Sequence, residues 1–183
     1  MGYLSLRDEE MEPAAESLKE DIVAQVVARV ADCYDKHDLC CSESICYVLS
    51  QAFAGGLSGR DAVRLGAGYC HGMGGAGCSC GALTGAVAML AFYLSPHSPE
   101  GLRKKPFRRE IRAMHDQFRQ RFHSTCCRVL SKKGEAGRRR FNCQELTEAG
   151  AEMAAHVLLT VRPHLMEAVD RQFLQDRTCS LTG

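Results

Sequence analysis

The sequence predicts an all-α fold, with a single helical domain of five or more helices and one loop that is rich in glycine and cysteine. Apolar residues recur every three or four positions in several segments, as they do on the buried face of an amphipathic helix. No segment long enough for a strand alternates apolar and polar residues. With 183 residues, of which 45% are hydrophobic and 25% charged, the chain has the size and composition of one globular domain over residues 1–183.

Three helices are predicted in the first third of the chain. The first covers residues 13–34, where Pro13 suits an initial helical position and an apolar stripe follows. The second lies between the polar turn at 35–38 and the glycines at 55–56, which favour a helix end. The third, short helix covers residues 58–66 and begins with a capping-box-like pattern.

The remaining helices follow a glycine-rich segment. A helix of small residues covers 82–94, and a helix with aromatic residues on one face covers 107–122. A short helical turn is predicted at 126–130. The periodicity over residues 142–173 predicts one long helix with a kink near Pro163.

Residues 66–81 read GAGYCHGMGGAGCSCG, with seven glycines and three cysteines, which predicts a loop with positive φ angles or a close backbone approach. A phosphate-binding loop would need Gly-Lys-Ser/Thr after a strand, and a dinucleotide site would need a βαβ unit. Neither is present, so no nucleotide cofactor is expected. Residues 1–12 and 176–183 are expected to be flexible.

Charge is distributed unevenly along the chain. Residues 1–50 contain eleven acids and four bases, whereas residues 101–140 contain fourteen bases and three acids. The compensating acidic stretch and the lack of interleaved aromatic residues favour a solvated helix face over nucleic-acid binding. The sequence has no apolar run of about eighteen residues and no signal-peptide pattern, so neither a membrane nor nucleic acid is an expected partner. The expected localisation is cytoplasmic.

The eleven cysteines are the unusual feature of the composition. In a reducing compartment, such a density indicates metal ligation or catalytic thiols rather than a disulfide scaffold. A helix N-terminus presents unpaired N–H groups and partial positive charge, which stabilise a thiolate and lower a thiol pKa. Four cysteines fall at predicted helix starts, and we expect them to converge on one metal site: Cys41, Cys80, Cys127 and Cys143.

The segments around these four cysteines read CCSESICYVLSQAF, CSCGALTG, TCCRVL and NCQEL. Over about residues 40–160 the chain resembles a family of redox-active proteins named for the pattern C, then GCAxxG, then C, then C. The resemblance implies a redox role, and a related module in split-Soret cytochrome c implies an iron–sulfur-type centre. Covalent haem is not expected, because Ala67 stands where a C-x-x-C-H motif ending at His71 would need its first cysteine.

The primary interpretation is therefore a redox or electron-transfer protein with an iron–sulfur cluster, whose type the sequence does not specify, and a redox partner of unknown identity. The alternatives are a thiol–disulfide protein without metal, a zinc site, and a helical interaction protein with inert buried thiols; a homodimer is compatible with each. Cys40, Cys78 and Cys126 are alternatives to their neighbours as ligands. His71 is either a ligand or, as we favour, a hydrogen-bonded loop histidine.

Overall fold

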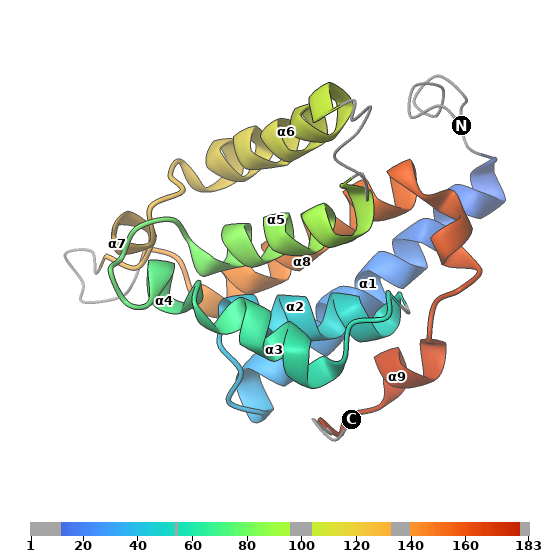
Figure 1. The fold of residues 1–183 in the computed structure, drawn as a ribbon, viewed down its shortest axis with the longest axis horizontal. Helices are drawn as coiled ribbons and strands as arrows, with labels where there is room; N and C mark the ends of the chain where they lie inside the picture. Colours follow the sequence, from blue (N-terminus) through green and yellow to red (C-terminus); the bar gives the residue numbers. More distant parts are fainter. Residues whose placement is uncertain (1–11, 54, 96–103, 133–139, 180–183) are drawn as a thin grey trace.

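The computed structural model describes residues 12–53, 55–95, 104–132 and 140–179 (Figure 1). These residues contain nine α-helices and one 3₁₀ helix, and no strand. This confirms the all-α class. The helices are α1 (Pro13–Lys36), α2 (Cys41–Ala52), α3 (Gly59–Ala67), α4 (Cys70–Met73), α5 (Gly81–Leu94), α6 (Lys104–Phe122), α7 (Cys127–Leu130), α8 (Cys143–Val161), the 3₁₀ helix η1 (Pro163–Met166) and α9 (Arg171–Gln175).

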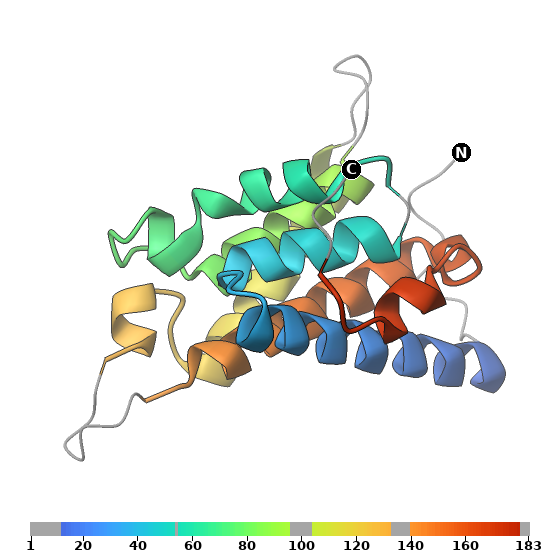
Figure 2. The same ribbon diagram turned by 90° about the horizontal axis from the view of Figure 1, so that it is seen from below.

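The long helices α1, α2, α5 and α8 form the centre of the molecule, and α3, α6 and α9 lie outside them (Figures 1 and 2). Helix α8 packs against both α1 and α5, and α2 packs against α5 and α3. Two glycines allow close approach at the start of α5. A Cβ on Gly150 of α8 would lie 2.7 Å from the carbonyl oxygen of Ala82, and one on Gly85 would lie 2.9 Å from Cα of Ser42. The first turns of α5 thereby lie close to the start of α2 and to the middle of α8.

Helix α8 ends at Val161, so the predicted continuous helix through residue 173 is wrong. Pro163 has no N–H to donate and disfavours the helical conformation of the residue before it, and Arg162 accordingly lies at φ −131° and ψ 66°. The helix therefore ends there instead of continuing with a kink. The chain continues as η1 and α9, and the backbone N–H of Asp170 donates to the carbonyl oxygen of Ala52 at 2.9 Å.

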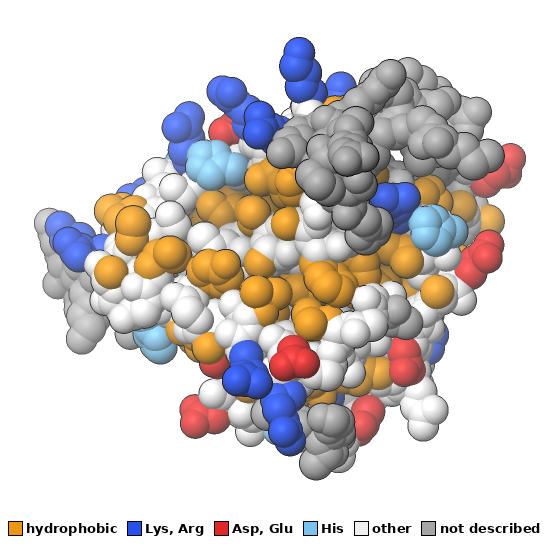
Figure 3. Space-filling model, in the orientation of Figure 1, with side chains coloured by type: hydrophobic (Ala, Val, Ile, Leu, Met, Phe, Trp, Pro, Cys, Tyr) orange, Lys and Arg blue, Asp and Glu red, His pale blue; other side chains and the backbone are white. Residues whose placement is uncertain are grey.

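Helix α6 confirms the predicted division into an apolar and a basic face. Met114, Phe118 and Phe122 are buried. Exposed bases of α6 pair with acids on α6 and α8, as in the contact of 2.7 Å between Arg121 and Glu152. Figure 3 shows Lys and Arg side chains along the upper edge, where α6 lies, and a band of hydrophobic side chains below them. None of the described helices is long and apolar enough to cross a membrane.

The chain ends were expected to be flexible. Residues 1–11 and 180–183 lie outside the described residues, as does the middle of the basic loop at 133–139. Residues 176–179 are described and lie beside the C-terminal end of α1, where Nε2 of His37, the residue after the helix, is 3.0 Å from the carbonyl oxygen of Arg177.

Candidate functional site

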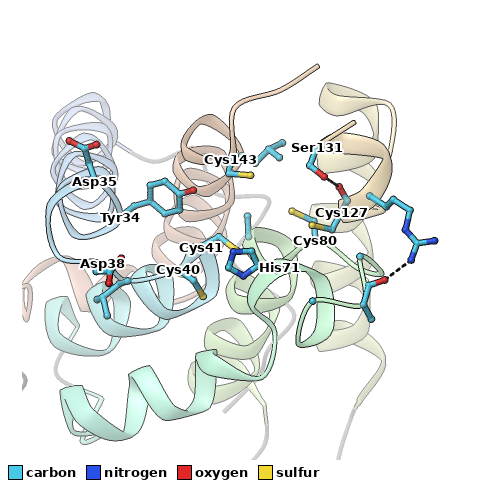
Figure 4. A pocket seen from close by; sticks show the side chains of 18 residues that line it. Tyr34, Asp35, Asp38, Cys40, Cys41, His71, Cys80, Cys127, Ser131 and Cys143 are labelled. Atoms are coloured by element: carbon cyan, nitrogen blue, oxygen red, sulfur yellow. Dashed lines mark hydrogen bonds between the residues drawn. The ribbon is translucent and has the colours of Figure 1, made fainter. Parts of the chain in front are cut away.

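A cavity of about 660 Å³ opens at the end of the molecule where four helices begin (Figure 4). All four cysteines predicted as ligands line it. Cys41 is the first residue of α2, Cys80 is the residue just before α5, Cys127 is the first residue of α7, and Cys143 is the first residue of α8. The structure thus brings together four thiols that are spread over more than a hundred residues of sequence.

Hydrogen bonds between two loop segments hold Cys80 and Cys127 near each other. The backbone N–H of Cys80 donates to the carbonyl oxygen of Thr125 at 2.8 Å. The backbone N–H of Cys127 donates to the carbonyl oxygen of Cys78 at 2.6 Å. An isolated antiparallel bridge lies between these two bonds. Two cysteines that lie 47 positions apart in sequence are therefore fixed by backbone pairing.

Side-chain caps fix the starts of the other two helices. Asn142 accepts a hydrogen bond from the backbone N–H of Gln144 at 3.1 Å, which confirms it as the N-cap of α8. Glu43 accepts a hydrogen bond from the backbone N–H of Cys40 at 2.8 Å, immediately before α2. Each cap defines where its helix begins, and in each case the first residue of the helix is a cavity cysteine.

The sulfur of Cys80 has the helix-start environment that the sequence predicts, but its pKa moves in the opposite direction. Burial raises the pKa of this thiol to about 12, although the backbone N–H groups of Ala82 and Leu83 donate to the sulfur and favour the thiolate. The expectation of a lowered pKa is wrong for Cys80, because loss of solvation outweighs the two hydrogen bonds.

Cys41 has a similar environment. Burial raises its pKa, while the backbone N–H groups of His71 and Ser42 donate to its sulfur and act in the opposite direction. The backbone of His71 is at φ 54°, in the left-handed region, and its imidazole lines the cavity (Figure 4). The glycine-rich segment therefore supplies a donor to the sulfur through its backbone.

The prediction that residues 66–81 form a loop is only partly correct. Helix α3 continues to Ala67, and α4 forms a single irregular turn within the segment. Its expected positive φ angles and close approach are both present. Gly72 has φ 73°, and a Cβ added there would lie 2.5 Å from Cβ of Cys127. A side chain at this position would displace a cavity cysteine.

The four sulfurs face a common space (Figure 4) and influence one another electrostatically. Charge on Cys143 or Cys127 would raise the pKa of Cys41, and charge on Cys41 or Cys127 would raise the pKa of Cys80. Among the described residues, however, no three of these sulfurs all lie within 4.8 Å of one another. A single tetrahedral zinc ion with bonds of about 2.3 Å would hold its sulfurs about 3.8 Å apart. No three of the four sulfurs are therefore as close together as the ligands of a single zinc ion would be.

The neighbouring cysteines that were alternatives as ligands have other positions. Cys40 forms a disulfide with Cys70, with Cα atoms 5.9 Å apart. Cys78 is exposed, and the thiol of Cys126 donates to the carbonyl oxygen of Gly77 at 3.3 Å. The disulfide was missed from the sequence, because its cysteines lie 30 positions apart and no motif links them.

An all-helical domain that directs four cysteines from four helix starts into one cavity defines a cysteine-rich protein of the redox-active class. The family described as "Putative redox-active protein (C_GCAxxG_C_C)" matches residues 39–157, and the chain belongs to this family. The matched segment contains all four cavity cysteines. The chain matches no curated protein and no solved structure.

The raised pKa of Cys80 gives a testable pH dependence in metal-free protein. With a pKa of about 12, the thiolate fraction at pH 8 is about one part in ten thousand. Alkylation of Cys80 by iodoacetamide should therefore be slow at pH 8 and should accelerate about tenfold for each pH unit up to pH 10. Peptide mass spectrometry measures the rate, with exposed Cys78 as an internal reference. A rate at Cys80 that does not change with pH would contradict the assigned direction.

Proposed function

We propose that this protein is an electron-transfer or redox protein in which Cys41, Cys80, Cys127 and Cys143 hold an iron–sulfur cluster. The observation that carries the proposal is the convergence of four thiols from four helix starts on one cavity. Thiolates are soft ligands, and four of them are the usual ligand set of such clusters. A bound cluster would supply reversible one-electron chemistry.

Two properties of the site favour a cluster over zinc. No three of the four sulfurs lie within 4.8 Å of one another, as three ligands of a single tetrahedral ion would, whereas a cluster with several iron atoms holds its thiolates at wider spacing. Backbone N–H groups already donate to the sulfurs of Cys41 and Cys80. Such hydrogen bonds stabilise negative charge on ligating sulfurs and tune the reduction potential of a cluster.

Residues around the four cysteines would support the centre without ligating it. His71 donates its backbone N–H to Cys41, which agrees with a loop histidine that positions the site. Arg128 lines the cavity, and its guanidinium donates to the carbonyl oxygen of Ala76 at 2.7 Å, so a positive charge is held at the rim. The proposal includes a reducing compartment, because nine of the eleven cysteines are not in a disulfide. It also includes a separate redox partner.

The decisive experiment is metal and sulfide analysis of the full chain purified without oxygen. We expect iron and acid-labile sulfide in stoichiometric amounts, together with visible absorbance that bleaches on reduction. Protein that contains stoichiometric zinc, or that is colourless and free of metal after anaerobic purification and reconstitution with iron and sulfide, would overturn the cluster.

A thiol–disulfide protein without metal is the second candidate, and one observation favours it. The disulfide between Cys40 and Cys70 lies next to the cavity, and Cys40 contributes to the cavity wall. If metal-free protein exchanged this disulfide reversibly with a dithiol reductant, and the Cys40→Ser variant lost that exchange while keeping its helical circular dichroism, the second candidate would become the leading one.

A further inference from the structure

A compact group of metal-binding side chains lies beside the cavity and contains none of the four proposed cluster ligands. Its members are Cys40, Glu43 and Cys70, and one ligand atom from each lies within 4.8 Å of the other two. In the part of the chain that the structure describes, this is the one group of three Cys, His, Asp or Glu side chains that meets this distance. No three of the cavity cysteines meet it, so the group is separate from the proposed cluster site.

The backbone at two helix starts positions the three side chains. Cys40 directly precedes α2, Glu43 lies in the first turn of α2, and Cys70 is the first residue of α4. The Cα atoms of the two cysteines are 5.9 Å apart, and their sulfurs form the disulfide. The carboxylate of Glu43 accepts a hydrogen bond from the backbone N–H of Cys40 at 2.8 Å, which holds it over the helix start. The carboxylate therefore stays close to both sulfurs.

A buried hydroxyl group and the cavity surround this group. Ser42 is fully buried, its hydroxyl lies 3.4 Å from each of the two sulfurs, and it donates to the carbonyl oxygen of Gly66 at 2.8 Å. Such a neighbour can orient ligands without binding the metal itself. Cys40 lies beside Cys41 at the cavity wall (Figure 4), so water can reach the group from the cavity. Three protein ligands and one water are the ligand number of an open zinc site.

We propose that Cys40, Glu43 and Cys70 form a second metal site, which binds one zinc ion when the disulfide between the two cysteines is reduced. Zinc takes thiolate sulfur at about 2.3 Å and carboxylate oxygen at about 2.0–2.2 Å. Tetrahedral ligands at these distances lie about 3.6–3.8 Å apart, which is inside the limit of 4.8 Å that the three side chains meet. Two sulfurs favour zinc over Mg²⁺ and Ca²⁺, which take oxygen ligands. The site does not depend on the proposed cluster.

The disulfide is the closed form of the site, and a dithiol reductant opens it. The S–S bond between Cys40 and Cys70 breaks, a new S–S bond forms within the reductant, and its two electrons and two protons give two protein thiols. Zinc then binds the two sulfurs as thiolates and displaces one proton from each. In the reverse direction, a small disulfide oxidant takes two electrons from the thiolates, takes up two protons and leaves as two thiols, and zinc is released.

The first test compares zinc binding by full-length variants that have been reduced with a dithiol, which is then removed without oxygen. Native mass spectrometry measures the zinc bound per chain. Cys70→Ser should bind one zinc ion fewer than the matched variant Cys78→Ser, whose exposed thiol lies in the same glycine-rich segment. Wild-type protein with an intact disulfide should also bind one zinc ion fewer than reduced wild-type protein. Equal zinc in the two variants, or no gain on reduction, would overturn the second metal site.

Glu43→Gln separates the metal ligand from the helix cap and keeps both cysteines. Glutamine can also accept the hydrogen bond from the backbone N–H of Cys40, but it replaces the carboxylate with a neutral amide. The zinc affinity, measured by competition with a chromophoric chelator, should fall at least about tenfold, because even outer partners of metal ligands contribute about ten- to a hundredfold. Glu145→Gln, in the first turn of α8, is the control and should keep the wild-type affinity. Equal affinities for these two variants would refute ligation by the carboxylate.

The same variants distinguish this proposal from those made for the cavity. Zinc that Cys70→Ser loses belongs to the second metal site and leaves the cluster untouched. Zinc that Cys80→Ser loses and Cys70→Ser keeps lies in the cavity, and it would overturn the cluster. Reduction of the disulfide by a dithiol is common to zinc binding and to simple thiol–disulfide exchange, and the zinc bound after reduction separates the two.

Discussion

Replacing Cys80 or Cys143 by serine should remove nearly all of the iron, the acid-labile sulfide and the visible absorbance from anaerobically purified protein. Each residue contributes one of the four thiols that line the cavity. A serine hydroxyl has a far higher pKa than a thiol and binds soft metals poorly, so loss of one ligand should disrupt the whole centre. Both variants should keep their helical circular dichroism. Iron, sulfide and absorbance per mole of protein are the measurements.

The matched controls are serine variants of cysteines away from the cavity. Cys33→Ser and Cys179→Ser should keep the full iron content, because neither side chain lines the cavity. Exposed Cys78→Ser should also keep it, although this residue lies only two positions from Cys80. If all of these variants, including Cys80→Ser and Cys143→Ser, contained the same amount of iron and absorbed equally, the four-cysteine site would be wrong. A helical interaction protein would then become the leading interpretation.

Gly81→Ala should have the second large effect, through packing and without loss of a ligand. A Cβ at this position would lie 2.5 Å from the sulfur of Cys41 and 2.8 Å from the carbonyl oxygen of Tyr69. Both contacts are far inside van der Waals distance, so the sulfur must shift. We expect a loss of about 1–3 kcal/mol in the free energy of unfolding, together with loss of most of the iron. Denaturant titration and iron analysis measure the two effects.

Gly68→Ala is the control for this substitution. Gly68 has φ −66°, and no other heavy atom lies within 4 Å of the added Cβ. Its free energy of unfolding should stay within about 0.5 kcal/mol of the wild type, as is usual for surface substitutions, and the iron content should not change. If Gly81→Ala behaved in the same way as Gly68→Ala, close packing of α5 against Cys41 would not be needed to position the sulfur.

Much of the fold could be predicted because local signals coincide with the helix ends. The apolar stripe that begins after Pro13 predicts α1, and the cap at Asn142 predicts the start of α8. The break before Pro163 was underestimated. Apolar periodicity continues past this residue, but the backbone conformation of Arg162 interrupts the helix and sends the chain back over α1 and α2. Periodicity shows which side chains are buried and does not show that one helix carries them all.

The candidate site could be predicted in part for a similar reason. A cysteine beside a cap residue, such as Cys143 after Asn142, can be placed at a helix start from sequence alone. The disulfide between Cys40 and Cys70 depends on tertiary packing, and no spacing rule reveals it. The direction of the Cys80 pKa shift was also inaccessible, because it depends on how deeply the neighbouring helices bury the sulfur.

The positions of the four cavity cysteines along the chain also determine when the site can assemble during translation. Cys41 and Cys80 emerge from the ribosome early, Cys127 follows much later, and Cys143 opens a helix that contacts both α1 and α5. A nascent chain therefore exposes three cavity thiols before the fourth exists. In the proposed cluster protein, insertion of a centre that uses all four thiols would therefore follow synthesis of α8.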